Sequence, residues 1–374
     1  MTWQLVEDDT ALHALLEDNR DCTSVVVDTE FMRRNTFYPQ VALVQLCFDV
    51  PDQASPTAWL VDPLKLSDLT PLVALLEDPA VTKVLHSASE DLEVFQRWLG
   101  ALPSPLFDTQ RAAALLDMGF GLGYRALVSE ICDVDLPKGE TRSDWLQRPL
   151  TESQCHYAAQ DVTYLLQVYR DLHERCVGAG KLDWVLSDGR DALAAVNRNG
   201  DEFYKRIKGG WKLDRDQLAA LIALSGWREE TARRRDKPRS WIIDDKACLE
   251  LARLSPGTMD ELRGMPELPA PLVRRHGEEL LDVLSGQRSL PEEQLPQPLP
   301  EPLNAAQRDQ LKRLKKSARE LAAQLSIAPE VLLQSKDYEL LLREAAGEAV
   351  VEPAHWRGWR SESAIAPLRA SLAA

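Results

Sequence analysis

The sequence has few cysteines, no long apolar run and a deficit of positive charge. Its six cysteines form no C-x-x-C pair, which is untypical of a zinc site and predicts reduced thiols in a cytoplasmic protein. No segment approaches the ~18 consecutive apolar residues that span a bilayer, so no membrane partner is expected. G-x-S-x-G, Walker A and H-E-x-x-H motifs are absent, which excludes serine hydrolases, NTPases and zincins. The 374 residues carry 44 Lys and Arg against 59 Asp and Glu, a net charge of −15, which at first sight argues against a polyanionic partner.

The charge is unevenly distributed along the chain. Between Phe203 and Trp241, eleven basic residues face five acidic ones, a local excess of +6, and residues 310–319 form a second basic stretch. One such run is most simply a solvated helix face. Two runs, the first with interspersed aromatic residues, favour a phosphate-binding surface, with Arg233, Arg234 and Arg235 as candidate contacts.

Strand and helix signals alternate over the first 200 residues. Apolar and β-branched runs predict strands at 24–31, 41–50, 58–64, 81–88 and 105–110. Helical periodicity predicts helices at 69–77, 89–99, 109–118, 123–132 and 151–177. Ser89 is the expected N-cap of the second helix, and Thr151 with Gln154 forms a capping box for the last one.

The rest of the chain is predicted to be helical. A Pro-rich segment at 291–302 is a linker by composition, and the sequences on either side of it partly repeat. We therefore expect four parts, namely an α/β domain over 1–200, a helical module over 210–290, the linker, and a second related module over 303–374.

Four acidic residues are candidates for a chemical site. Asp28 and Glu30 lie two residues apart at the end of a strand, so their side chains point to one face, although such a pair alone is most simply two solvated acids. Asp91 begins the helix after the fourth predicted strand. Asp161 lies on the long helix with Tyr157 one turn before it, among apolar neighbours where an unpaired charge is unfavourable. That setting favours a metal or cationic partner.

These segments resemble the three motifs of the DEDD exonuclease superfamily, in the subclass with Tyr in the third motif. The matching sequences are VVVDTEF at 25–31, the Glu-Asp of HSASEDLEVF at 86–95, and YAAQDVTYL at 157–165. Residues 137–150, PKGETRSDWLQRPL, resemble the segment before the third motif in the bacterial ribonuclease D family, and the two helical modules resemble HRDC domains. The resemblance implies a multidomain protein, with an α/β RNase H-like 3′–5′ exonuclease domain, its mixed sheet flanked by helices, followed by two all-α HRDC domains.

The resemblance also implies a function and a metal site. It predicts a 3′–5′ exoribonuclease that trims tRNA precursors and other small structured RNAs, with two divalent ions, Mg²⁺ or Mn²⁺, and nucleoside 5′-monophosphates as products. Asp28 would bridge both ions, Glu30 and Asp161 would hold the ion with the attacking water, and Asp91 would help to hold the second ion. Tyr157 would orient the water.

Five further residues are weaker candidates for substrate contacts. Phe31 and Met32 follow the first two carboxylates and would contact the terminal base, while Lys138, Arg142 and Arg148 would contact phosphates. The expected partner is RNA with a single-stranded 3′ end, bound by a monomer. Two alternatives stay open at this point, namely a 3′–5′ exonuclease that acts on DNA and an RNA-binding protein with an inactive nuclease domain.

Overall fold

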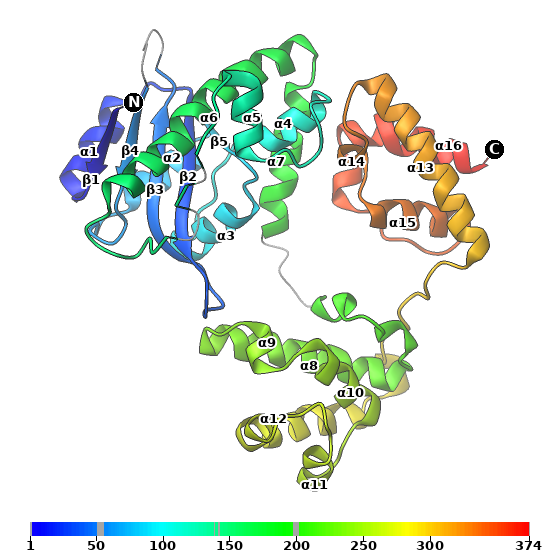
Figure 1. The fold of residues 1–374 in the computed structure, drawn as a ribbon. Helices are drawn as coiled ribbons and strands as arrows, with labels where there is room; N and C mark the ends of the chain where they lie inside the picture. The colour runs from blue at the N-terminus through cyan, green and yellow to red at the C-terminus, as the bar shows by residue number, and fades with distance from the viewer. Residues whose placement is uncertain (1, 51–55, 138, 141–142, 197–201, 374) are drawn as a thin grey trace. The chain divides into compact units, whose positions relative to one another are not determined.

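The computed structural model describes residues 2–50, 56–137, 139–140, 143–196 and 202–373. The chain forms two compact units (Figure 1). The first consists of Met1–Met32, Pro39–Asn197 and Leu303–Ala374, and the second of Arg33–Tyr38 and Arg198–Pro302. In the described ranges, no helix is both long and apolar enough to cross a membrane.

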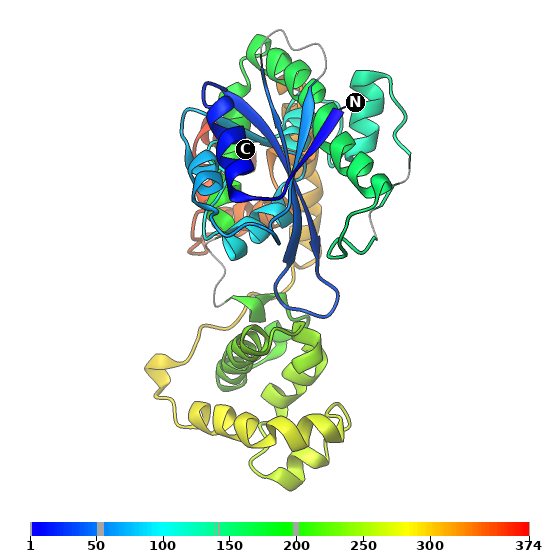
Figure 2. The same ribbon diagram turned by 90° about the vertical axis from the view of Figure 1, so that its left-hand side faces the viewer.

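A six-stranded mixed sheet forms the centre of the first unit. Its order is β1-β4-β3-β2-β5-β6, and β3 runs antiparallel to both of its neighbours while the other pairs are parallel. The long strands β2 and β3 run through its middle (Figure 2). Five strands and the mixed sheet were predicted, whereas β1 was not. The strands are β1 (Thr2–Val6), β2 (Ser24–Met32), β3 (Gln40–Phe48), β4 (Thr57–Val61), β5 (Thr82–Leu85) and β6 (Leu106–Asp108).

Helices cover both faces of the sheet because its central strands are apolar on both sides. Along β2, Val25 and Val27 pack in one core with α1, α2 and α3, and Val26 packs in the other with α6. The Thr151 capping box is confirmed at the start of α6, but the N-cap of α3 is Ala88 and not Ser89. The helices are α1 (Asp9–Asp18), α2 (Thr70–Glu77), α3 (Ser89–Trp98), α4 (Thr109–Leu115), α5 (Tyr124–Cys132), α6 (Glu152–Gly178) and α7 (Leu182–Val196).

The second unit is helical and includes the loop between β2 and β3. Phe37 in this loop is 4% exposed and belongs to the core of the unit. The Asp236 carboxylate accepts hydrogen bonds from the backbone N–H groups of Phe37 at 2.9 Å and Tyr38 at 3.0 Å. The helices are α8 (Arg215–Arg235), α9 (Arg239–Ile242), α10 (Asp245–Leu254), α11 (Met259–Arg263) and α12 (Ala270–Arg288), with 3₁₀ turns at Phe203–Arg206, Gly210–Lys212 and Glu292–Gln294.

The C-terminal part of the first unit repeats the helical pattern of the second. α13 (Ala305–Leu325), α14 (Pro329–Leu332) and α15 (Ser335–Ala345) start at 305, 329 and 335, against 215, 239 and 245 for α8, α9 and α10. The spacing is 90 residues each time. Capping boxes at Asp214 and Asn304 start the long helices, and left-handed residues Asp236 and Ser326 end them. After α15 the likeness ends, because short turns at Ala354–Trp356 and Ser361–Ile365 lead into α16 (Ala366–Ala373).

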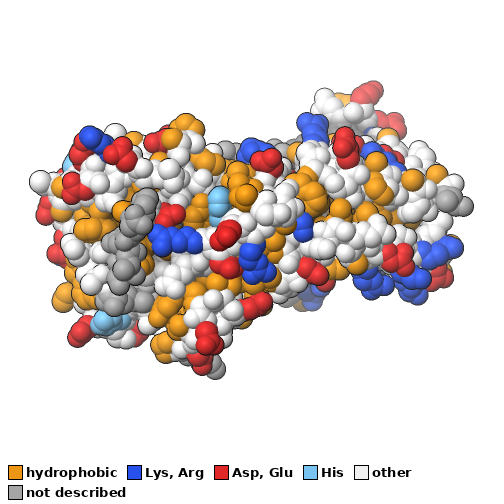
Figure 3. Space-filling model, turned by 90° about the horizontal axis from the view of Figure 1, so that it is seen from above, with side chains coloured by type: hydrophobic (Ala, Val, Ile, Leu, Met, Phe, Trp, Pro, Cys, Tyr) orange, Lys and Arg blue, Asp and Glu red, His pale blue; other side chains and the backbone are white. Residues whose placement is uncertain are grey.

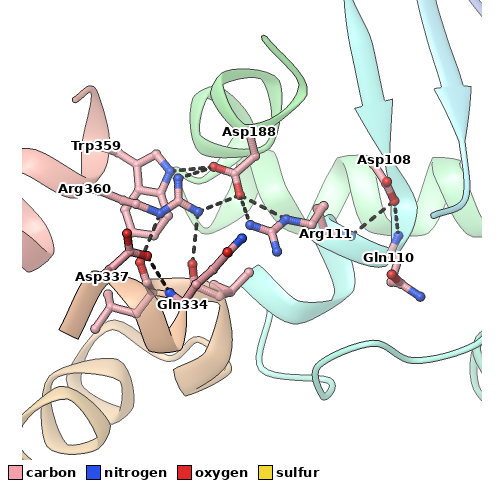
Figure 4. Close-up of polar contacts among 10 residues, drawn as sticks. Asp108, Gln110, Arg111, Asp188, Gln334, Asp337, Trp359 and Arg360 are labelled. Atoms are coloured by element: carbon pink, nitrogen blue, oxygen red, sulfur yellow. Dashed lines mark hydrogen bonds and ion pairs between the residues drawn. The ribbon is translucent and has the colours of Figure 1, made fainter. Parts of the chain in front are cut away.

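A buried acid joins this C-terminal module to the domain that contains the sheet (Figure 4). Asp188 on α7 accepts hydrogen bonds from Arg360 at 2.6 and 2.9 Å, from Arg111 at 2.7 Å and from the indole of Trp359 at 3.1 Å. Burial opposes ionisation of Asp188, but these partners hold its pKa below the usual value. The Lys181 ammonium, also buried, donates to backbone carbonyls on both sides of the contact. The module therefore packs against α4 and α7 as part of one body.

Candidate active site

Three carboxylates converge between β2 and α6. Asp28 and Glu30 have the same strand parity as Val26, so they point to the face that α6 covers, and Asp161 comes from α6. One ligand oxygen from each of the three lies within 4.8 Å of the others, and all three side chains are partly buried. Three of the acids that the sequence singles out therefore lie together in the fold.

Asp91 approaches the same group from the other direction. It lies in the first turn of α3, is 9% exposed, and accepts a hydrogen bond from the hydroxyl of Thr29, the residue between the two acids of β2. The charge of Asp91 adds to burial, Asp28 and Asp161 in raising the pKa of Glu30, and the charge of Asp28 adds to burial in raising the pKa of Asp91. Asp91 thus stands beside the three converging acids, held by a threonine whose role the motif pattern did not indicate.

Burial and mutual repulsion make these acids hard to ionise. Burial is the main cause that raises the pKa of Asp28 to about 8 and of Asp161 to about 7, and the charge of Asp161 adds to the effect on Asp28. Burial, followed by the charge of Asp28, raises the pKa of Glu30 and of Asp91. A divalent cation among them would favour the ionised forms and reverse these shifts.

Tyr157 lies one turn before Asp161, and its hydroxyl donates a hydrogen bond to the Asp161 carboxylate. Burial, together with the charges of Asp161 and Glu30, raises the pKa of Tyr157 well above its usual range. The hydroxyl therefore stays protonated and can act as a donor but not as a base. Its ring lies 6.0 Å from the ring of Trp145, which is 1% exposed.

The start of α6 is fixed against the segment that precedes it. Gln154, in the capping box of Thr151, donates from its amide to the Asp144 carbonyl at 3.1 Å and to the Ser143 hydroxyl at 3.0 Å. The side chain of Gln154 is fully buried. Residues that follow within α6, Tyr157 and Asp161 among them, are thereby oriented from the first turn of the helix.

Among the weaker candidates, Arg148 is engaged by other parts of the protein. Its five N–H groups are all engaged, with two on the buried Asp62 carboxylate at 2.6 and 2.8 Å and three on backbone carbonyls. Arg148 is therefore held by contacts within the protein, and its phosphate contact stays a prediction. Phe31 and Met32 lie half-buried at the end of β2, after a bulge, while Lys138 and Arg142 lie outside the described residues.

The arginines of the basic stretch are also partly engaged within the second unit. Arg233 pairs with Glu229 at 2.8 Å, and Arg235 lies 2.8 Å from the imidazole of His276. Arg234 has 59% of its side chain exposed and pairs with Glu279 at 3.8 Å. These internal contacts limit what Arg233 and Arg235 can offer to a phosphate.

Comparisons with known proteins agree with this geometry. A 3′–5′ exonuclease family model matches residues 3–176, and an HRDC domain model matches residues 217–284. Ribonuclease D of Pseudomonas paraeruginosa is 44% identical over 362 residues, which cover 96% of this chain and 94% of that protein. Ribonuclease D of Escherichia coli is 40% identical over 303 residues, 80% of this chain and 78% of that one. The crystal structure of Escherichia coli RNase D superposes with a TM-score of 0.89 at 36% identity and covers 100% of this chain and 98% of its own.

The RNase H-like mixed sheet and the convergent carboxylates define a 3′–5′ exonuclease that depends on divalent metal. An HRDC domain accompanies the nuclease domain. The chain belongs to the ribonuclease D family and is a 3′–5′ exoribonuclease.

Proposed function

We propose that Asp28, Glu30, Asp91, Tyr157 and Asp161 form the catalytic centre, and that the four carboxylates hold two divalent ions, Mg²⁺ or Mn²⁺. The observation that supports this proposal is the approach of ligand oxygens from Asp28, Glu30 and Asp161 to within 4.8 Å of one another. Oxygen donors alone suit hard cations of this kind. When bound, two such ions would stabilise the entering water and the departing 3′ oxygen of an in-line displacement.

The protein's own groups orient the reactants. The protonated Tyr157 hydroxyl, next to Asp161, would hold the attacking water by a hydrogen bond. Thr29 would keep Asp91 in place through its hydroxyl. Phe31 and Met32, at the end of the strand that carries Asp28, would contact the terminal nucleotide.

Replacement of Asp161 by Asn tests the site. The change keeps the size of the side chain and removes one anionic ligand, so turnover should fall at least about a hundredfold while RNA affinity stays close to that of the wild type. Glu174→Gln, at an exposed position of the same helix, is the matched control and should leave turnover unchanged. Turnover in Asp161→Asn near that of the wild type would contradict the proposal.

We further propose that the substrate is structured RNA with a single-stranded 3′ tail, tRNA precursors above all. The Escherichia coli relative is described as an exoribonuclease involved in structured RNA processing. A 3′-extended tRNA and a DNA strand matched to its tail, each incubated after EDTA treatment with added Mg²⁺ or Mn²⁺, should show metal-dependent loss of the RNA with release of nucleoside 5′-monophosphates. Preferential digestion of the DNA would overturn the RNA assignment.

The helical modules would bind the RNA outside the catalytic centre. We propose residues 1–200 as the exonuclease domain, 210–290 as the first HRDC domain, 291–302 as a linker and 303–374 as a second HRDC-like module, supported by the 90-residue repeat.

In the first module Trp241 is 59% exposed and lines a groove of about 290 Å³ together with Arg275, which suits a stacked base beside a phosphate. In the second, basic side chains gather on the surface of the module (right in Figure 3), with exposed positions on α13 at Lys312, Arg313, Lys316 and Arg319.

We also propose that the enzyme works as a cytoplasmic monomer. All six cysteines are free thiols, and four of them are buried, which fits a reducing compartment. The buried thiols Cys47 and Cys248 have a pKa raised by burial to about 12, so they are unreactive as nucleophiles. A single species near 42.0 kDa in light scattering would support the monomer.

A further inference from the structure

The side chain of Gln45 lies buried in the middle of the sheet without a polar partner. The residue is 0% exposed, and within the described part of the chain neither its amide oxygen nor its amide nitrogen makes a hydrogen bond. A buried amide with both groups unpaired is unfavourable, and such groups are rare in folded proteins. The position therefore calls for a reason other than packing.

Gln45 stands directly opposite Asp28 in the antiparallel pair of β2 and β3. Opposed residues of such a pair point to the same face, with Cβ atoms about 4.5–5.5 Å apart. Leu43 and Cys47, two residues to either side on β3, pack in the core beneath α6. The Gln45 amide consequently lies on the face where Asp28 meets Asp161, within a side chain's length of the Asp28 carboxyl.

The chemistry of the two groups is complementary. An ionised carboxylate only accepts hydrogen bonds, and a glutamine amide offers two N–H donors. The backbone N–H of Thr29 already donates to Asp28, which leaves further lone pairs of the carboxylate open. The amide donor of Gln45 and the open lone pairs of Asp28 therefore match in hydrogen-bonding character.

We propose that Gln45 is a positioning residue for Asp28: its amide N–H donates through one bridging water to the carboxylate and so orients the carboxylate toward a bound divalent cation. The inference rests on the proposed role of Asp28 as a metal ligand. Residues that hold a metal ligand in this way commonly change metal affinity or activity by about 10- to 100-fold when they are replaced.

Gln45→Met tests the inference, because methionine has a similar length and no N–H donor. In EDTA the variant should melt a few degrees higher than the wild type, since the unpaired amide is gone. The Mg²⁺ concentration that gives half of the metal-induced rise in melting temperature should increase about tenfold, and kcat on a 3′-tailed RNA should fall at least about tenfold with KM little changed. If Gln45 were merely structural, the variant would melt higher in EDTA, but its Mg²⁺ dependence and its kcat would stay those of the wild type.

Two further variants sharpen the test. Leu43→Met changes a fully buried neighbour on the same face of β3 and should leave the Mg²⁺ dependence and kcat unchanged. Gln45→Glu keeps the shape but replaces the donor by another acid, so it should weaken Mg²⁺ binding at least as much as Gln45→Met. Wild-type kcat and Mg²⁺ dependence in either Gln45 variant would overturn the role of Gln45 while the metal site stands. If the wild type itself shows no Mg²⁺-induced shift, the metal site and this inference fall together.

Discussion

Replacement of Asp28 by Asn should abolish cleavage and at the same time stabilise the metal-free protein at alkaline pH. Asp28 ionises near 3.8 in an unfolded chain, and burial together with the charge of Asp161 raises its pKa to about 8 in the folded one. Between these values the folded protein binds more protons than the unfolded one, so the free energy of unfolding falls as the pH rises. Asparagine cannot ionise and escapes this loss.

The magnitude follows from the same pKa. Each pKa unit corresponds to about 1.4 kcal/mol, so the difference between 3.8 and about 8 sets an upper bound of about 6 kcal/mol. Solvent reaches the partly exposed side chain and screens its repulsion, which reduces the expected gain to about 2 kcal/mol at pH 8.5. For a body of this size that gain raises the melting temperature by about 4–8 °C. Below about pH 4 it should vanish, because Asp28 is then neutral in both states.

Thermal unfolding in EDTA at several pH values measures this gain. The difference between Asp28→Asn and wild type should grow from pH 5 to pH 8.5, and Mg²⁺ should stabilise the wild type more than the variant. Asp21→Asn removes a carboxyl whose side chain is 97% exposed and should show neither effect. A melting temperature of Asp28→Asn at or below the wild-type value at pH 8.5 would refute the argument that uncompensated repulsion is stored in this cluster.

Two further predictions concern neighbours of the site and the C-terminal module. A Cβ at Gly139 would lie 2.0 Å from Cδ2 of the Tyr157 ring, so Gly139→Ala should displace the tyrosine and lower kcat about tenfold or more, but not in a Tyr157→Phe background. Gly123→Ala, where a Cβ meets nothing within 4 Å, is the control, and an equal loss in both backgrounds would contradict the reasoning. Asp188→Asn should cost about 3 kcal/mol of stability, because it removes the carboxylate that pairs with the buried Arg360, and limited proteolysis should then release the C-terminal module. Asp183 on the same helix is exposed, so Asp183→Asn is the control and should resist proteolysis like the wild type. Equal resistance in Asp188→Asn would contradict the idea that Asp188 holds the C-terminal module in place.

The cluster of Asp28, Glu30 and Asp161 could be predicted from sequence because its geometry is set locally. Asp28 and Glu30 share a face through the two-residue period of a strand, and Asp161 follows a capping box that fixes the start of its helix. These local rules fix the face of β2 that carries Asp28 and Glu30 and the place of Asp161 on α6. The approach of the three acids could therefore be expected without knowledge of distant contacts. Strand β1 was missed because its short run, exposed at most positions, lacks the apolar density of the central strands.

The roles that sequence could not reveal depend on partners far along the chain. Arg148 meets Asp62, 86 positions earlier, and Asp188 meets Arg360, 172 positions later. Neither sequence separation could be predicted from the period of a helix or a strand. Gln45 is hidden in another way, because an apolar strand with one glutamine shows its significance only when the register with Asp28 is known.

The basic stretch shows why a count of charges overstates the capacity to bind phosphate. Glu229 holds both Arg233 and Arg239, and the guanidinium of Arg239 lies 4.6 Å from the centre of the Phe37 ring. Arg228 is 5% exposed and pairs with Asp245. Several charges that looked available in the sequence thus stabilise the second unit, including the loop between β2 and β3. A buried or paired arginine releases few counterions on binding RNA. If the modules bind RNA as proposed, exposed groups would make the phosphate contacts, and the surface around Trp241 and the exposed positions of α13 meet that requirement.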